Sequence, residues 1–163
     1  MIILDLNNLS KRRYRAILVL VLLGPMMVGI TAYAVQNLLL QNSATITTGN
    51  PNFFMVTGVI STTDCSTITG YSNSGLNIQW GSLSQGSVAQ QFVCLENTGS
   101  PHVISISNNL PSTYGSITAT IGTTGTPANG QTINHNSFIL LNFTWTVDAS
   151  APSGAAQFSI SVQ

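Results

Sequence analysis

Residues 139–147 read ILLNFTWTV, and this stretch decides the fold class. Apolar side chains stand at every second position, namely Ile139, Leu141, Phe143, Trp145 and Val147. Three of the four residues between them are polar. Successive side chains of a β-strand point to opposite faces of a sheet. The alternation therefore predicts a strand with one face in a hydrophobic core and one mostly polar face.

Shorter runs with a period of two recur along the chain. They cover residues 76–80, 88–95, 104–107, 117–121 and 157–162, with weaker candidates at 44–48 and 53–60. Turn signals rich in Gly, Asn and Ser separate these runs. Seven or eight short strands with such punctuation predict an all-β, antiparallel β-sandwich of immunoglobulin-like architecture over residues 51–163. Trp80 and Trp145 are the first candidates for its core, and residues 123–136 are expected to form an exposed loop.

Charge is scarce and unevenly placed. Only 5% of the 163 residues are charged, whereas a typical globular domain has about 25%. All four basic residues precede residue 16: Lys11, Arg12, Arg13 and Arg15. A nucleic-acid partner is not expected, because binding of that kind needs a basic surface.

The basic cluster in residues 1–15 is followed by twenty uncharged residues, Ala16–Val35. A helix of this length spans roughly 30 Å, the thickness of a bilayer core. Positive charge on its N-terminal side predicts that the remainder is exported to the cell surface or beyond. Three interpretations stay open. A signal peptide would be cut after Ala34; residues 16–35 would otherwise remain as a membrane anchor; and Arg15-Ala16-Ile17 resembles a processing site of archaeal type IV pilins. A buried helix of a soluble protein fits the flanking charge less well.

Cys65 and Cys94 are the only cysteines. In an exported chain an even pair favours a disulfide bond. Closing a loop of about thirty residues stabilises a fold by roughly 3 kcal/mol in the chain-entropy model.

No residue pattern indicates catalysis or a cofactor. The two cysteines lack the spacing of a zinc site, and His102 and His135 are more typical of surface residues than of a metal pair. Nothing in the sequence spacing of Asp64, Glu96 and Asp148 indicates a calcium site. These residues could bind calcium together only if the fold brought them close to one another. No serine lies in an activated-nucleophile motif. We therefore expect no enzyme, no metal, no cofactor and no small-molecule substrate.

Asn142-Phe143-Thr144 is an N-glycosylation sequon. Asn142 falls on the polar side of its strand, opposite Leu141 and Phe143. This position predicts an outward side chain to which a glycan could attach.

Three segments resemble a known family. Residues 78–87, IQWGSLSQGS, are similar to an I-x-W-G-x-L-x-P-G-x segment of small exported archaeal sandwich proteins, with Gln85 where proline is usual. Residues 93–100, VCLENTGS, resemble their V-x-V-x-N-x-G-N segment, and residues 143–160 resemble their closing strand pair. These proteins are similar in turn to the TasA/camelysin-like matrix-fibre and archaeal bundling-pilus subunits. The resemblance covers about residues 44–162.

This resemblance implies an exported immunoglobulin-like or jelly-roll domain that polymerises through an N-terminal donor strand, without catalysis. The residues make such assembly plausible independently, because no Lys or Arg follows Arg15 to guard an edge strand. Within the stem at 36–50, the segment Leu38–Gly49 would pair with a neighbouring subunit, its donor positions being Ala44, Ile46 and Thr48. An ordinary first strand or a flexible stem is the alternative for this segment.

The expected function is a structural subunit of an extracellular filament, pilus or cell-surface matrix that assembles with copies of itself. The alternatives are a membrane-anchored surface module that binds without polymerising, and a type IV pilin-like subunit whose helix forms the filament core.

Overall fold

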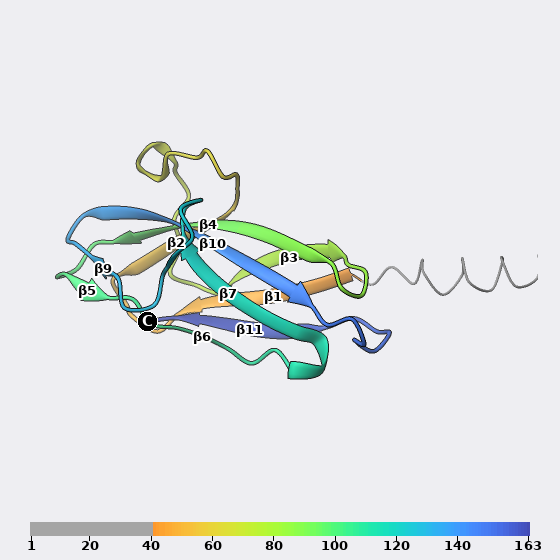
Figure 1. Cartoon of the computed structure of the whole chain (residues 1–163). Coiled ribbons are helices and arrows are strands. Elements are labelled where there is room, and N and C mark those ends of the chain that lie inside the picture. The colour runs from red at the N-terminus through yellow and green to blue at the C-terminus, as the bar shows by residue number, and fades with distance from the viewer. Residues whose placement is uncertain (1–40) are drawn as a thin grey trace, which may run out of the picture. The chain divides into compact units, whose positions relative to one another are not determined.

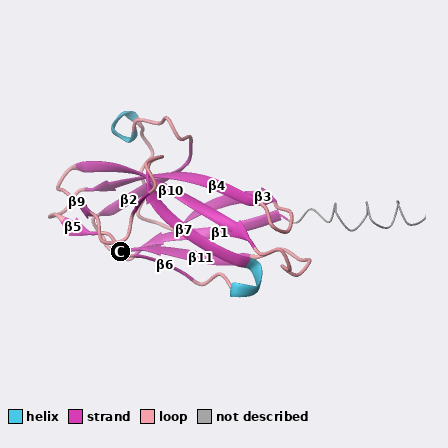
Figure 2. Ribbon diagram, in the orientation of Figure 1, coloured by secondary structure: helices cyan, strands magenta, loops and turns pink. Residues whose placement is uncertain are grey.

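A computed structural model describes residues 41–163 (Figure 1). This part of the chain is all-β, with strands joined by loops and two single 3-10 turns (Figure 2). The expected helix at 16–35, the basic segment at 1–15 and the cleavage position Ala34 lie outside the described residues. The strands are β1 (Gln41–Thr48), β2 (Phe53–Val59), β3 (Leu76–Ser82), β4 (Val88–Asn97), β5 (His102–Val103), β6 (Ile106–Asn108), β7 (Gly115–Ile121), β8 (Thr126–Pro127), β9 (Thr132–Ile133), β10 (Ser137–Val147) and β11 (Gln157–Val162), and the turns are η1 (Cys65–Thr67) and η2 (Ser112–Tyr114).

The strands form two main sheets and one small pair. Sheet A has the order β3-β1-β11-β6, sheet B has the order β2-β4-β10-β7-β8, and β5 pairs with β9. Every pairing is antiparallel except β1 with β11, which is parallel. The expectation of a wholly antiparallel arrangement is wrong at this pair. A hairpin would impose opposite directions, but β1 and β11 are the first and last described strands and no short turn joins them.

The two main sheets contribute to one core. Trp80 of β3 and Trp145 of β10 meet edge to face, with ring centroids 5.6 Å apart. Phe158 of β11 packs on the other side of Trp145 at 5.2 Å. Aromatic pairs favour this geometry over face-to-face stacking. The two tryptophans are thus core residues, as the sequence predicts.

The alternation in β10 is also confirmed. Leu141 and Phe143 are fully buried, and Trp145 and Val147 retain at most 7% exposure. Ile139 is partly buried against the same cluster. Thr146, on the opposite face, is exposed. This strand lies in the middle of sheet B, between β4 and β7.

Eleven strands in residues 41–163 exceed the seven or eight expected, and two of them lie where an exposed loop was predicted. Within residues 123–136, β8 and β9 form, and Ala128 and Ile133 are buried. The segment is held by main-chain hydrogen bonds that local composition does not reveal. Ala128 N donates to Ala119 O on sheet B at 3.0 Å, and Gly130 N donates to Ile104 O beside sheet A at 2.9 Å.

Candidate functional site

The predicted donor strand lies inside this chain's own sheet. β1 sits between β3 and β11, with Ala44 opposite Ile78 and Phe158. Ala44 is 1% exposed and Ile46 is fully buried, while Thr48 is half-buried. The expected apolar face is therefore present, and it fills the core of the same molecule. β1 also belongs to the compact unit formed by the rest of the described chain, so the domain begins within the segment expected to be a stem.

Asn42 fixes the start of β1, a role that sequence analysis missed. Its side chain is 5% exposed; Oδ1 accepts a hydrogen bond from Ala156 N at 2.9 Å, and Nδ2 donates to Gly81 O at 3.3 Å. β3 and the residue that precedes β11 are thereby tied to β1. The sequence position of Asn42 could have indicated this role. Asn42 precedes Ala44 by two residues, so in a strand it lies on the same buried face as Ala44 and Ile46, and a buried polar side chain needs hydrogen-bond partners.

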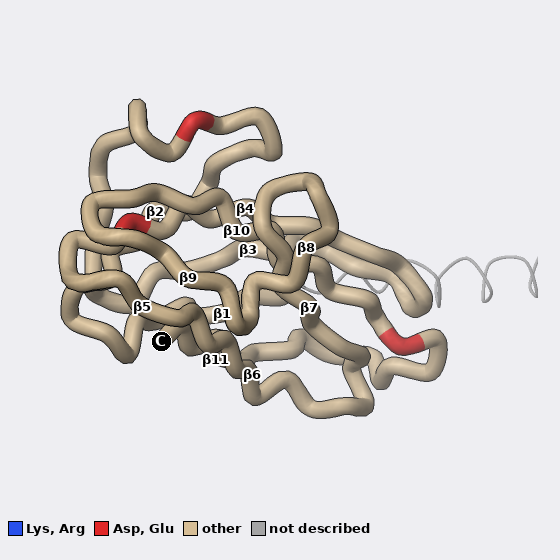
Figure 3. Tube along the Cα trace, turned by 60° about the vertical axis from the view of Figure 1, so that its left-hand side comes forward, with Lys and Arg blue, Asp and Glu red and all other residues tan. Residues whose placement is uncertain are grey.

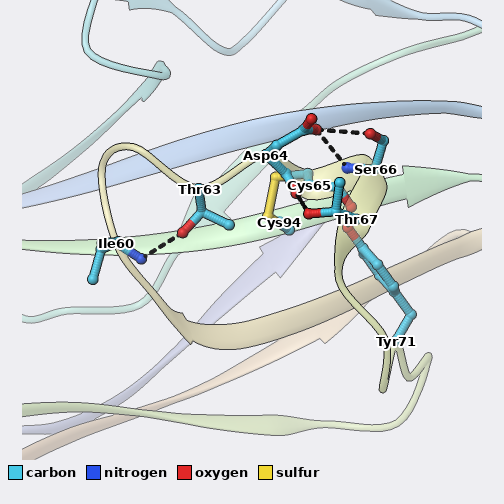
Figure 4. The surroundings of a disulfide bond; sticks show 8 residues. All are labelled: Ile60, Thr63, Asp64, Cys65, Ser66, Thr67, Tyr71 and Cys94. Carbon is cyan, nitrogen blue, oxygen red and sulfur yellow. Dashed lines mark hydrogen bonds between the residues drawn. A yellow bond between two sulfur atoms is a disulfide. The ribbon is translucent and has the colours of Figure 1, made fainter.

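The predicted disulfide is present. Cys65 and Cys94 are bonded, with their Cα atoms 5.5 Å apart, within the usual range (Figure 4). Cys94 is fully buried although it alternates with the core residues Val93 and Leu95, so it faces the outer side of sheet B. The loop that contains η1 contacts β4 and β10. The disulfide therefore clasps this loop onto the outer face of sheet B.

Hydrogen bonds inside the clasped loop shape it around Cys65. Asp64 Oδ1 accepts bonds from Ser66 Oγ at 2.7 Å and from Ser66 N at 3.0 Å. These two bonds favour the carboxylate, so they lower the pKa of Asp64 below its ordinary value. Tyr71 Oη donates to Cys65 O at 2.7 Å, as Figure 4 shows in the same loop.

The hydroxyl group of Tyr71 is a weaker acid than an ordinary tyrosine hydroxyl. Its pKa is raised to about 12, mainly by burial and to a smaller extent by the negative charges of Glu96 and Asp64. Its ring packs against Phe138 at a centroid distance of 5.7 Å. At neutral pH the hydroxyl therefore remains a donor, which suits its bond to the Cys65 carbonyl.

Asn142 is placed differently from the prediction. It lies on the outer face of sheet B, but its side chain is only 6% exposed. Its strand is an interior one, and its Cα partners Phe92 and Thr120 stand on either side. The expectation of an accessible sequon is wrong for the folded domain, so a glycan would have to be added before this strand is packed.

Asn97 is a second buried polar residue that sequence analysis did not single out. It is fully buried; its Nδ2 donates to Ser100 O at 2.8 Å and to Ile133 O at 3.1 Å, and its Oδ1 accepts from Gly99 N. One amide thus joins the end of β4 to the turn after it and to β9. The Asn-x-Gly turn signal indicated the turn but not this longer link.

The candidate catalytic and metal groups do not gather. Within residues 41–163 no three His, Cys, Asp or Glu side chains are close enough to hold a metal ion, and the acidic positions are scattered (Figure 3). Asp148 accepts bonds from Ser150 N and Oγ, which lower its pKa. His102 packs on Phe53 with ring centroids 5.5 Å apart, and His135 Nδ1 lies 2.8 Å from Gly99 O. These contacts are structural.

In the described part of the chain, no helix has both the length and the apolar character needed to span a bilayer. No family model matches the chain, and no curated protein is significantly similar to it.

Proposed function

We propose that the protein is an exported structural subunit of a filament, pilus or surface matrix, built on an immunoglobulin-like or jelly-roll sandwich. Self-assembly by exchange of β1 between copies is the proposed mechanism. The leader at 1–35 would carry the domain out of the cytoplasm. The resemblance to TasA/camelysin-like and bundling-pilus subunits supports this proposal, as does the shortage of charge.

The observation that carries the proposal is the position of β1. It is the first strand of the described residues, so it can leave without threading through the residues that follow it. It is also interior to sheet A, so its departure opens a slot between β3 and β11 and removes Ala44 and Ile46 from the core. A neighbour's β1 would restore every lost contact. Exchange of an identical element is a low-cost route to association, and a head-to-tail exchange propagates.

A pair of cysteines tests where β1 resides. Thr45 and Asn77 are exposed Cα partners on β1 and β3, and their side-chain oxygens lie 3.5 Å apart. In assembled protein, oxidised Thr45→Cys/Asn77→Cys should link different chains and give a ladder of covalent oligomers on a non-reducing gel. A product of monomer mass alone would contradict strand exchange and favour the anchored surface module.

Sheet B offers a matched control. Gln90 and Thr144 are Cα partners whose side chains are also hydrogen-bonded, at 3.4 Å, and neither belongs to β1. Gln90→Cys/Thr144→Cys should therefore form its bond within one chain whether or not β1 is exchanged. A ladder from this pair would show that oxidation links subunits indiscriminately.

A further inference from the structure

Sheet B is only three strands wide at one end. β2 pairs with residues 92–97 of β4, which leaves Val88–Gln91 without a paired strand on that side, although the Gln91 side chain donates to Gln79 O of β3. β8 pairs only with Thr120 and Ile121 of β7, which leaves Gly115–Thr118 uncovered by a strand. Both uncovered stretches pair with the same part of β10, residues 143–147. The sheet therefore has an unpaired edge on β4 and another on β7, and both lie level with residues 143–147 of β10.

Glycine and a short hairpin create these open edges. Gly58 adopts φ 78° where the register of β2 shifts between Thr57 and Val59, and pairing with β4 ends at the next residue, where Val59 lies opposite Phe92. A bulge with a left-handed glycine bends an edge strand away from its partner. On the other side, β8 is two residues long, and the chain then turns toward β6.

The hydrogen-bonding groups of the two edges can be assigned. Val147 N donates to Ser87 O, so in this antiparallel ladder Val88 and Gln90 direct their main-chain groups away from β10. Gly122 N donates to Leu140 O, so by the same alternation Ile117 directs its groups away from β10. Ile117 N–H and C=O, Val88 C=O and Gln90 N–H thus point out of the sheet.

These groups match one another across two copies. β4 and β7 run parallel, because each is antiparallel to β10, and both Ala89 and Ile117 are Cα partners of Trp145. In a parallel ladder one residue bonds to the two residues that flank its partner. If a second copy is displaced sideways in the plane of sheet B, Ala89 of one copy lies opposite Ile117 of the other. Ile117 N–H would then meet Val88 C=O, and Gln90 N–H would meet Ile117 C=O.

The surroundings suit this contact. No charged residue lies on either edge, and Val88 is an exposed apolar side chain with 61% of its surface free. A groove of about 480 Å³ runs beside β7, lined in part by Ile106, Ile117, Ala119, Pro127 and Ile160. A strand added to β7 would lie over this groove. Soluble proteins usually guard such edges with lysine or proline, and neither occurs at these positions.

From this register we infer that sheet B continues from copy to copy, with Val88–Gln91 of one molecule added in parallel to Gly115–Ala119 of the next. The partner is a second copy of this chain. The contact joins two different edges, so it is heterologous and repeats without closing unless the rotation between copies closes a ring. It is independent of the exchange of β1, because both edges belong to sheet B.

A second cysteine pair tests this contact. Val88 and Ser116 flank Thr146 on the same outer face. Two strand spacings, about 9.6 Å, separate them within one molecule, too far for a disulfide. In the inferred contact they become direct neighbours. Oxidation of assembled Val88→Cys/Ser116→Cys should give a ladder of covalent oligomers, whereas monomer alone would overturn the inference.

Two controls make the result specific. Val88→Cys/Ser159→Cys carries two exposed cysteines that the inferred contact does not bring together, and a comparable ladder from it would overturn the inference. Adding Gln90→Pro to the Val88→Cys/Ser116→Cys protein removes an outward main-chain N–H and the exposed side-chain bond to Thr144 Oγ1, but no main-chain bond to β10. It should reduce cross-linking several-fold without lowering the unfolding midpoint by more than a few degrees. If Val88→Cys/Ser116→Cys gives a ladder and Thr45→Cys/Asn77→Cys gives only monomer, the edge contact is retained and strand exchange is rejected. If Thr45→Cys/Asn77→Cys gives a ladder and Val88→Cys/Ser116→Cys gives only monomer, strand exchange is retained and the edge contact is rejected.

Discussion

The two ends of sheet B share the same central strand but are finished in different ways. At one end β2 pairs with β4, the disulfide clasps a loop over the outer face, and Asn97 links the adjoining turns. At the other end only β4, β10 and β7 are paired, the outer face is exposed at Thr118 and Thr146, and the edges of β4 and β7 carry no paired strand. We call these the clasped end and the open end.

The difference separates two ways of stabilising a β-sheet. The clasped end is held by a covalent bond and buried polar groups, and its main-chain edge is covered. The open end relies on the core beneath it, where Trp145 contacts Trp80 and Phe158. Trp145 also donates from Nε1 to Tyr114 O at 3.1 Å, which ties β10 to the residue before β7. Because the core packing around Trp145 stabilises the open end, its edge strands can remain unpaired and available to a partner.

The largest expected effect is therefore at the open end. Trp145→Ala should lower the free energy of unfolding by roughly 3–5 kcal/mol, because it removes a fully buried aromatic ring and leaves a cavity. Urea unfolding followed by circular dichroism measures this loss. The neighbouring exposed residue provides a control, since Thr146→Ala should change stability by less than about 0.5 kcal/mol. A loss below about 1 kcal/mol for Trp145→Ala would mean that the open end is held in some other way.

Removal of the clasp should have the next largest effect. Cys65→Ala/Cys94→Ala releases a cross-link between residues 29 positions apart, which predicts a loss of about 3–4 kcal/mol in the chain-entropy model. The loop should also become accessible to protease between residues 60 and 72. Limited proteolysis and urea unfolding measure the two consequences, with reduced wild-type protein as the control. If stability fell without new cleavage in the loop, the disulfide would act on the unfolded chain alone.

Much of this architecture follows from the sequence. The period of two in residues 139–147 identifies the central strand and its buried face, and the even cysteine count in a chain expected to be exported predicts the disulfide. Those signals are local, or depend only on composition. The same holds for the inward positions of Ala44 and Ile46, which any pairing of β1 would preserve.

The unpredicted features depend on distant parts of the chain. The parallel pairing of β1 with β11 joins residues more than a hundred positions apart, and no local pattern records its direction. Asn142 has the expected facing, but it is buried in a strand that is flanked on both sides, by β4 and by β7. The open edges likewise depend on where β2 and β8 stop, which is visible only once the strands are paired.

The smallest expected effect concerns the pH dependence of the clasped end. The pKa of Tyr71 is about 12 in the folded protein, above the ordinary value of 10.0. The folded state therefore holds this proton more tightly than the unfolded state. The resulting stabilisation is fully present below pH 10 and is lost as pH rises from about 10 to about 12.

Tyr71→Phe isolates this contribution. The variant keeps the ring against Phe138 but cannot ionise and cannot donate to Cys65 O. At pH 8 it should be less stable than wild type by about 1 kcal/mol, the usual value of one hydrogen bond. Between pH 10 and pH 12 the gap should narrow, because only the wild type loses the contribution of Tyr71. Tyr114→Phe is the matched control, since its hydroxyl lies outside the clasped loop. A gap between wild type and Tyr71→Phe that stayed constant up to pH 12 would show that ionisation of Tyr71 does not loosen the clasped end.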